Sequence, residues 1–135
     1  MEKTILIVED DPDIAECLQY NLELANFQTK VAHTGWEGLS VLLNAEKRPA
    51  LVLLDLNLPD LDGLEICRRV RATVEIQRIP IVMLTAYASD VDQARGLAAG
   101  VNTYITKPYS MRDVVSTIQG VLTASIGLAD PAPVT

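Results

Sequence analysis

Short apolar runs alternate along the chain with longer segments in which apolar residues recur every three or four positions. The runs at 4–8 (TILIV), 51–54 (LVLL) and 79–84 (IPIVML) are short and continuous. Such runs predict strands that are buried on both faces of a parallel sheet. The segments 27–32 (FQTKVA) and 103–106 (TYIT) alternate apolar with polar residues, which predicts strands nearer an edge of the sheet.

Helix signals lie between these predicted strands. An aspartate directly before Pro12 supplies an acidic N-cap and a proline at the first helical position. Capping-box patterns begin at Thr34, Ser89 and Ser110, and Gly100 fits the C-cap of the fourth helix. The alternation of strand and helix predicts an α/β fold with right-handed crossovers and helices on both faces of one parallel sheet.

The chain length of 135 residues leaves room for one domain. We expect this domain to span residues 1–124. Residues 125–135 lose helical periodicity and contain two prolines. We therefore expect a C-terminal tail or the start of a linker there.

Charge and composition narrow the classes of function. The formal charge is −7 and no run of Lys or Arg exceeds two residues, which argues against direct nucleic-acid binding. No apolar stretch approaches the roughly 18 residues of a membrane helix and no signal peptide stands out, so we expect a cytoplasmic protein without membrane contact. The two cysteines, Cys17 and Cys67, are expected to be buried helix thiols, as suits a reducing cytoplasm.

Polar residues directly follow several of the predicted strands. These residues are Glu9, Asp10, Asp11, Asp55, Thr85 and Lys107. Ligand sites in open α/β sheets form beyond the carboxyl ends of the strands. We therefore expect these side chains to share one cleft.

The chemistry of this set points to a metal and to phosphorus. Clustered carboxylates repel one another unless their pKa values rise or a cation lies among them. Oxygen ligands without thiolate or imidazole suit Mg²⁺, with Mn²⁺ as a possible substitute, and argue against Zn²⁺. A carboxylate can attack phosphorus to form an acyl phosphate, and Asp55 is the candidate nucleophile. The groups expected to assist it are Asp10 and Asp11 around the metal, and Lys107 and Thr85 as donors.

These residues stand in motifs that closely resemble the receiver domain of bacterial two-component response regulators. The matching stretches are ILIVEDD (5–11), LVLLDLNLPDLDGLEICRRVR (51–71), IPIVMLTAYA (79–88) and AAGVNTYITKPYS (98–110). The resemblance covers about residues 3–123. It implies a flavodoxin-like (βα)5 doubly wound parallel sheet with strand order 2-1-3-4-5.

The resemblance also implies a role for each site residue. Asp55 would accept a phosphoryl group from a sensor histidine kinase, a phosphotransfer protein or a small phosphodonor. Mg²⁺ would be held by Asp10, Asp11, Asp55 and the backbone carbonyl of Asn57. Lys107 would contact the phosphoryl group, next to a cis peptide bond to Pro108.

Two further residues would carry the signal onward. Thr85 would move toward the phosphoryl oxygens, and the ring of Tyr104 would turn inward to fill the space left. The surface of the fourth helix, fifth strand and fifth helix would then control a downstream effector protein or an attached effector domain. Asn57 and Tyr87 would tune the loss of the phosphoryl group, with Tyr87 as a shield against water.

One departure from the family concerns dimers. Receivers joined to winged-helix DNA-binding domains dimerise through paired charges on the same surface. The matching positions here are Gln93, Ala98, Thr103, Asp113 and Thr117. Only Asp113 keeps the expected kind of charge, so we do not expect that dimer.

Three alternatives remain open at this point. A Mg²⁺-dependent aspartyl phosphatase would place a second acid two residues after the nucleophile, where this chain has Asn57. A flavin-binding electron carrier would need a Ser/Thr/Gly-rich phosphate loop, where this chain has EDDPD (9–13). A receiver-like domain that works without phosphorylation would be expected to lack some chemical residues, and none is missing. We therefore expect a self-phosphorylating signalling switch and not an enzyme with a separate substrate.

Overall fold

The computed structural model describes residues 3–44, 48–86 and 89–129, with side chains as far as residue 124. A parallel sheet of five strands in the order β2-β1-β3-β4-β5 forms its centre. The strands are β1 (Thr4–Val8), β2 (Gln28–Ala32), β3 (Leu51–Asp55), β4 (Ile81–Thr85) and β5 (Thr103–Thr106). The helices are α1 (Pro12–Leu24), α2 (Gly35–Leu43), α3 (Gly63–Ala72), α4 (Asp90–Ala99) and α5 (Met111–Ala129).

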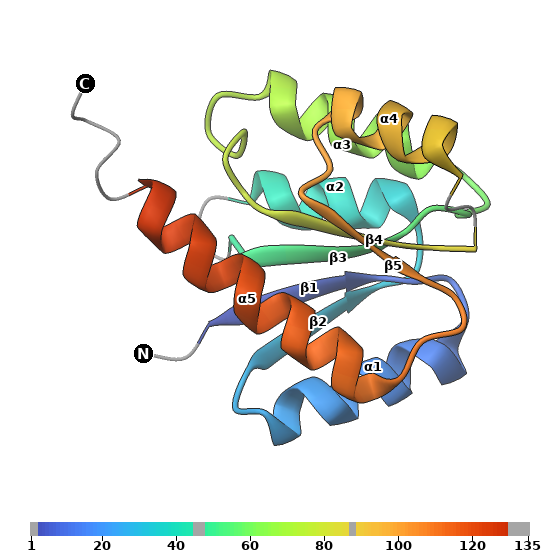
Figure 1. The fold of residues 1–135 in the computed structure, drawn as a ribbon, viewed down its shortest axis with the longest axis vertical. Helices are drawn as coiled ribbons and strands as arrows, with labels where there is room; N and C mark the ends of the chain where they lie inside the picture. The colour runs from blue at the N-terminus through green and yellow to red at the C-terminus, as the bar shows by residue number, and fades with distance from the viewer. Residues whose placement is uncertain (1–2, 45–47, 87–88, 130–135) are drawn as a thin grey trace.

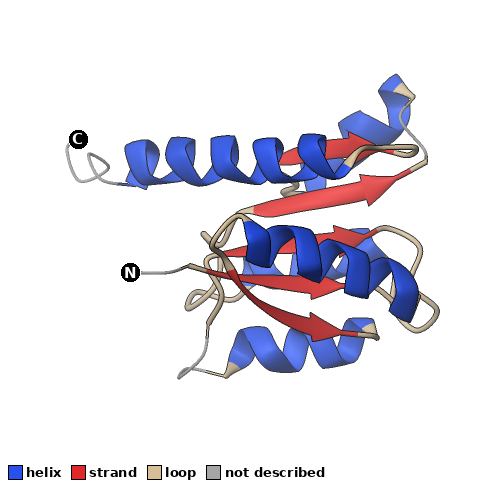
Figure 2. Cartoon of the chain, turned by 90° about the horizontal axis from the view of Figure 1, so that it is seen from below, coloured by secondary structure: helices blue, strands red, loops and turns tan. Residues whose placement is uncertain are grey.

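Helices cover both faces of the sheet (Figures 1 and 2). One apolar cluster joins the sheet to α2, α3 and the end of α4, and a second joins it to α1 and α5. Alternate residues of β1 enter the two clusters, because successive side chains of a strand point to opposite faces. The predicted flavodoxin-like fold and strand order are therefore confirmed.

The apolar runs form the central strands for the expected reason. All residues of β3 and β4 are buried, whereas β2, at the edge of the sheet, alternates between exposed and half-buried positions and is buried only at its last residue. The fourth strand begins two residues later than its pattern predicts. The Ile79 N–H bonds to Ile76 O in a turn at 3.1 Å, and Pro80 has no N–H to give to the sheet.

The helix caps also follow the sequence. Asp11 caps α1 by accepting from the N–H of Asp13 at 2.9 Å, and Pro12 occupies the first helical position. Ser89 Oγ accepts from Asp92 N at 3.1 Å at the start of α4. That helix ends at Gly100, whose φ of 103° lies in the left-handed region that glycine adopts without a steric cost.

Two expectations are corrected. Cys67 is buried, but Cys17 is exposed. On α1, Ala15 shares the inward face with Leu18 and Leu22, and this spacing leaves Cys17 on the outer side. The second correction concerns the last helix, which continues to Ala129, so the first residues of the predicted tail are helical. The domain boundary at residue 124 stays a prediction.

No helix within the described ranges is long and apolar enough to span a membrane.

Arg71 links three parts of the fold at the end of the sheet opposite the strands' carboxyl ends. Its guanidinium donates to Gln77 O at 2.8 Å, to Ile79 O at 2.7 Å and to Gly100 O at 2.7 Å and 3.0 Å. It also donates to Asn102 Oδ1 at 2.8 Å, and that same oxygen accepts from Ile81 N at 2.7 Å. The side chain therefore fixes α3 to the starts of β4 and β5.

We predict that Arg71→Lys lowers the free energy of unfolding by about 2–3 kcal/mol, because a lysine cannot bond several carbonyls in this planar arrangement. Urea denaturation measures the loss as a lower midpoint at an unchanged slope. Arg68→Lys is the matched control, since Arg68 is exposed and its ion pair in the described part of the chain is with Glu65 on its own helix. Its effect should stay within about 0.5 kcal/mol. Equal effects of the two substitutions would contradict this role for Arg71.

Candidate functional site at the carboxyl edge of the sheet

The strand order brings the ends of β1, β3 and β4 together at one edge of the sheet. Asp55 is the last residue of β3 and pairs with Leu84 of β4. Glu9 extends β1, because its N–H donates to Ala32 O at 2.9 Å. Thr85 ends β4 and is fully buried, and its carbonyl accepts from Lys107 N at 2.8 Å. The polar residues that follow separate strands therefore meet at one edge.

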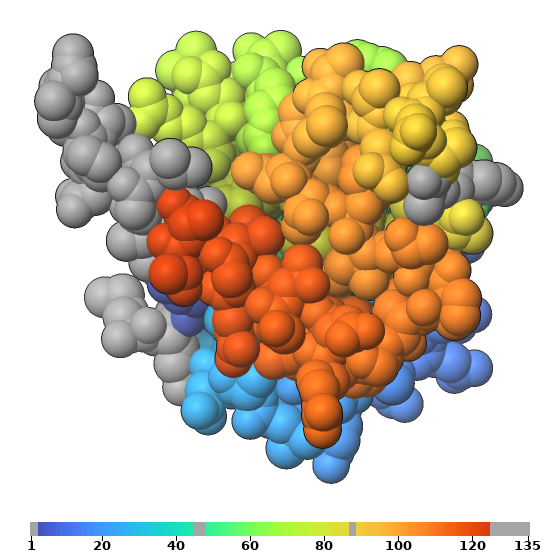
Figure 3. Space-filling view, in the orientation of Figure 1, coloured from blue at the N-terminus to red at the C-terminus, as the bar shows by residue number. Residues whose placement is uncertain are grey.

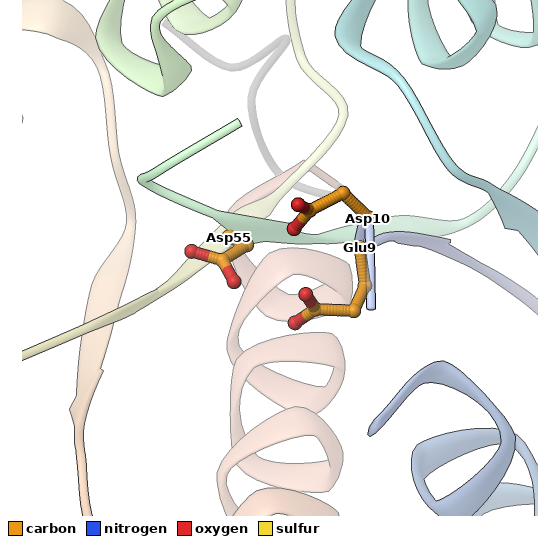
Figure 4. A group of neighbouring side chains, drawn as sticks. All are labelled: Glu9, Asp10 and Asp55. Carbon is orange, nitrogen blue, oxygen red and sulfur yellow. The ribbon is translucent and has the colours of Figure 1, made fainter. Parts of the chain in front are cut away.

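Three carboxylates form a compact group at this edge, those of Glu9, Asp10 and Asp55 (Figure 4). One oxygen from each lies within 4.8 Å of the others. Glu9 is 2% exposed and Asp55 is 3% exposed, whereas Asp10 faces solvent. Two buried charges at this separation repel by roughly 3–4 kcal/mol at an effective dielectric of about 20.

The two oxygens of Asp55 have different partners. Oδ2 lies 3.2 Å from Nζ of Lys107, in an ion pair that joins β3 to the loop after β5. Oδ1 accepts from the backbone N–H of Asn57 at 2.9 Å. Both contacts hold the plane of the carboxylate in a fixed orientation.

Glu9 is in a less favourable environment than Asp55. Its Oε2 accepts from Asp11 N at 3.2 Å, but its Oε1 is buried and has no hydrogen-bond partner in the described part of the chain. Burial, together with the neighbouring Asp55, raises the pKa of Glu9 to about 8. Lys107 offsets only one of the three carboxylates. A buried oxygen without a partner and a surplus of negative charge fit a hard divalent cation.

The structure brings together most of the residues predicted from the sequence. Asp10, Asp55 and Lys107 lie as expected, and the bond between Lys107 and Pro108 is cis as predicted. Asp11 does not join the carboxylate group, because its Oδ1 caps α1. Glu9 stands in the group in its place.

Sequence reasoning noted Glu9 at the strand end but did not assign it to the metal. A signal was present, since an acid next to Pro12 is already engaged as a helix cap and leaves the two preceding acids free. The predicted tuning residue Tyr87 lies outside the described residues. Its shielding role stays a prediction.

Tyr104 lies farther along the same sheet. Its ring packs against the cluster that includes α2 and α3, and its hydroxyl donates to Asp92 O in α4 at 3.1 Å. Burial raises the pKa of its phenol. The ring lines a cleft of about 420 Å³ together with Leu56, Asn57 and Asp92. The cleft therefore runs from α4 to the loop that carries Asn57.

Fold and pocket define a doubly wound α/β domain with a buried, lysine-paired aspartate at the carboxyl edge of its sheet. The family model described as "Response regulator receiver domain" matches residues 5–119. The chain belongs to this family and is a receiver domain of two-component signal transduction.

Solved structures agree with this assignment. A putative response regulator from Chloroflexus aurantiacus J-10-fl is 32% identical, with a TM-score of 0.84, over 91% of this chain and 99% of that one. A receiver domain protein from Methanospirillum hungatei JF-1 is 32% identical, with a TM-score of 0.84, over 93% and 97%. The receiver domain of a histidine kinase from Syntrophus aciditrophicus is 33% identical, with a TM-score of 0.81, over 90% and 91%.

The geometry predicts which acids bind Mg²⁺. Glu9→Gln and Asp10→Asn should each abolish most of the rise in Tm that Mg²⁺ gives the parent protein, because a ligand of the native state stabilises it in proportion to its affinity. Asp11→Asn is the matched control, since asparagine caps a helix as well as aspartate does. It should keep at least half of the Mg²⁺-dependent rise. Loss of the rise in Asp11→Asn alone would return Asp11 to the metal site.

Proposed function

We propose that this receiver domain accepts a phosphoryl group on Asp55 and that the aspartyl phosphate is its signal. The observation that carries the proposal is the pairing of a buried Asp55 carboxylate with Lys107 inside a group of acids. A buried carboxylate held by two donors is a positioned nucleophile. The donor is a phosphohistidine on a sensor kinase or phosphotransfer protein, or a small phosphodonor such as acetyl phosphate.

The transfer is a displacement at phosphorus. An oxygen of Asp55 forms the new bond to phosphorus, and the bond from phosphorus to the donor nitrogen or oxygen breaks and leaves its electron pair on that atom. The Asn57 N–H holds Oδ1 of Asp55 throughout. Lys107, which pairs with the free carboxylate, is placed to pair with the phosphoryl oxygens once they arrive.

A divalent ion completes the proposal. Glu9, Asp10 and Asp55 would hold Mg²⁺, or Mn²⁺ in its place, with the Asn57 carbonyl as the further ligand that the family implies. When bound, the ion offsets negative charge on the transferring group. Glu9 in this set takes the role that the sequence assigned to Asp11.

The phosphoryl group then changes a surface for a partner. It adds roughly −1.5 to −2 charges and three acceptors beside Thr85 and Lys107. We propose Thr85 and Tyr104 as the pair that responds. The elements α4, β5 and α5 form one continuous face of the molecule (Figure 3), and this face is the one we propose for a downstream effector protein or attached effector domain.

The proposed signalling function also accounts for features that an enzyme with a separate substrate would not share. Position 57 holds an amide where an aspartyl phosphatase needs an acid, so the phosphorylated state is expected to persist. Free Cys17 and Cys67 agree with a reducing cytoplasm, where we place the domain.

We predict that acetyl phosphate with Mg²⁺ adds one phosphoryl group to the protein, because the Asp55 nucleophile and its electrostatic partners are already in place. Intact mass measures the gain. Asp55→Ala should show no gain, and Asp113→Ala, which removes an exposed aspartate of α5, should match the parent. No gain in the parent with acetyl phosphate, phosphoramidate or a phosphorylated kinase would sink the proposal.

The expected absence of a winged-helix-type dimer is tested separately. Gln93, Ala98 and Asp113 are exposed on the α4–α5 face, and only Asp113 among them carries a charge. These positions therefore do not supply the paired charges that align two copies in that dimer. We expect size-exclusion chromatography to give the same elution volume with and without beryllofluoride and Mg²⁺. A shift to a dimer volume on activation, lost in Asp113→Asn, would refute this.

A further inference from the structure

Tyr104 lies across the inner side of helix α4. It stands in β5 opposite Met83 of β4, and its ring leaves the sheet toward α4. The hydroxyl reaches over the helix to donate to Asp92 O at 3.1 Å. Few side chains of α4 face the sheet, since its buried residues are Gly96 and Ala99.

Gly96 provides the space that this ring occupies. A Cβ atom at position 96 would overlap the hydroxyl oxygen and Cζ of Tyr104, and would lie 2.9 Å from Cε2. Contacts below 3.0 Å require something to move, and the obstacle here is a packed aromatic ring. Glycine inside a helix is unfavourable relative to alanine. The close approach of the ring explains why α4 carries a glycine at this position.

The ring also borders a cleft that includes the residues next to the phosphoacceptor. The cleft has a volume of about 420 Å³, and its lining includes Asp92 and Arg95 of α4 beside Tyr104, and Leu56 and Asn57 directly after Asp55. Asn57 holds Oδ1 of Asp55 through its N–H at 2.9 Å. The ring therefore borders open space in this cleft and lies directly against Gly96 on the side of α4.

We propose that Gly96 is the positioning residue that seats Tyr104 against α4, so that the location of the ring and the state of the Asp55 site form one coupled equilibrium. The proposal rests on the proposed function, because phosphorylation of Asp55 is the event that the ring reports. Beyond the proposed function, it assigns a role to one residue, Gly96, which lies on the helix proposed to face the partner and through which the ring acts. A side chain at position 96 removes one of the two places available to the ring, and the equilibrium shifts with it.

A double-mutant cycle separates the seat from a general packing effect. Gly96→Ala should lower the Tm of the full chain by about 3 °C or more when Tyr104 is present. The same substitution should raise the Tm in a Tyr104→Ala background, where no ring opposes the better helix former. In a Tyr104→Phe background a smaller decrease should remain, because Cζ and Cε2 still meet the new methyl group.

Gly120→Ala is the matched control. Gly120 is an exposed glycine inside α5, and a Cβ there would meet nothing within 4 Å. Its effect on the Tm should be small or stabilising, and should be the same with Tyr104 and with Tyr104→Ala.

A second double-mutant cycle measures whether residues 96 and 104 are coupled to the Asp55 site. The affinity for beryllofluoride in the presence of Mg²⁺ should change at least threefold in Gly96→Ala, remain unchanged in Gly120→Ala, and lose its dependence on residue 96 in the Tyr104→Ala background. If the ring moves into the cleft at no cost in stability, the coupling between positions 96 and 104 would be detected in the beryllofluoride affinity and not in the Tm. Coupling between positions 96 and 104 in the beryllofluoride affinity supports the proposal. Coupling in the Tm alone shows a packing contact without a link to the site and overturns the proposal, as does additivity in both measurements. If the parent binds no beryllofluoride, the proposed function fails, while the Tm cycle still decides whether Gly96 seats the ring.

Discussion

The burial of the central strands is the constraint on which the site depends. Every residue of β3 and β4 is buried, so neither strand can carry a charge before its last positions. Asp55 and Thr85 stand at those last positions, and Glu9 extends β1 beside them. Parallel strands end at the same edge, and the order β2-β1-β3-β4-β5 makes β1, β3 and β4 neighbours. Carboxylates from separate parts of the chain are thus held together although they repel one another.

The contacts that offset this repulsion are distributed unevenly between Asp55 and Glu9, and this difference determines the chemistry of the pocket. Asp55 is paired with the ammonium of Lys107 and accepts the N–H of Asn57, and these two contacts orient its carboxylate. Glu9 is buried, and its Oε1 has no hydrogen-bond partner among the residues that the structure describes; its raised pKa expresses the cost of placing a second charge there. A pocket with one paired carboxylate and one buried, unfavourable carboxylate suits the cation and the transferring group that we propose for it. The rest of the fold, including the Arg71 contacts at the opposite edge, keeps these groups from moving apart.

Most of the fold could be predicted from the sequence, and the predictions that were wrong have a common physical cause. Continuous apolar runs located β1, β3 and β4, and Pro12, Ser89 and Gly100 marked helix ends, because these signals are local. Asp11 was expected in the carboxylate group, but its side chain caps α1. An acid at this point of the chain can either cap the helix or face the pocket, and which it does depends on where β1 ends and α1 begins. Cys17 was placed on the wrong side of α1 for a similar reason, since a rotation of one residue exchanges it with Ala15. Gly96 gave only a weak signal, because its contact with the Tyr104 ring depends on how α4 packs against β5, and a local pattern does not show this packing.

Helix α4 differs from the other helices in how it is attached to the core. Its buried residues are small, Gly96 and Ala99, while Val91 and Leu97 are 63% exposed. A helix that buries little apolar surface gains little from any one position, so modest forces can shift it. Besides its packing on α3, helix α4 is held by the Tyr104 ring against Gly96 and by the bond from the Tyr104 hydroxyl to Asp92 O. Under the proposed function, a movement of this ring would carry a change at Asp55 to the surface, because it would remove a contact that the small buried side chains of α4 do not replace.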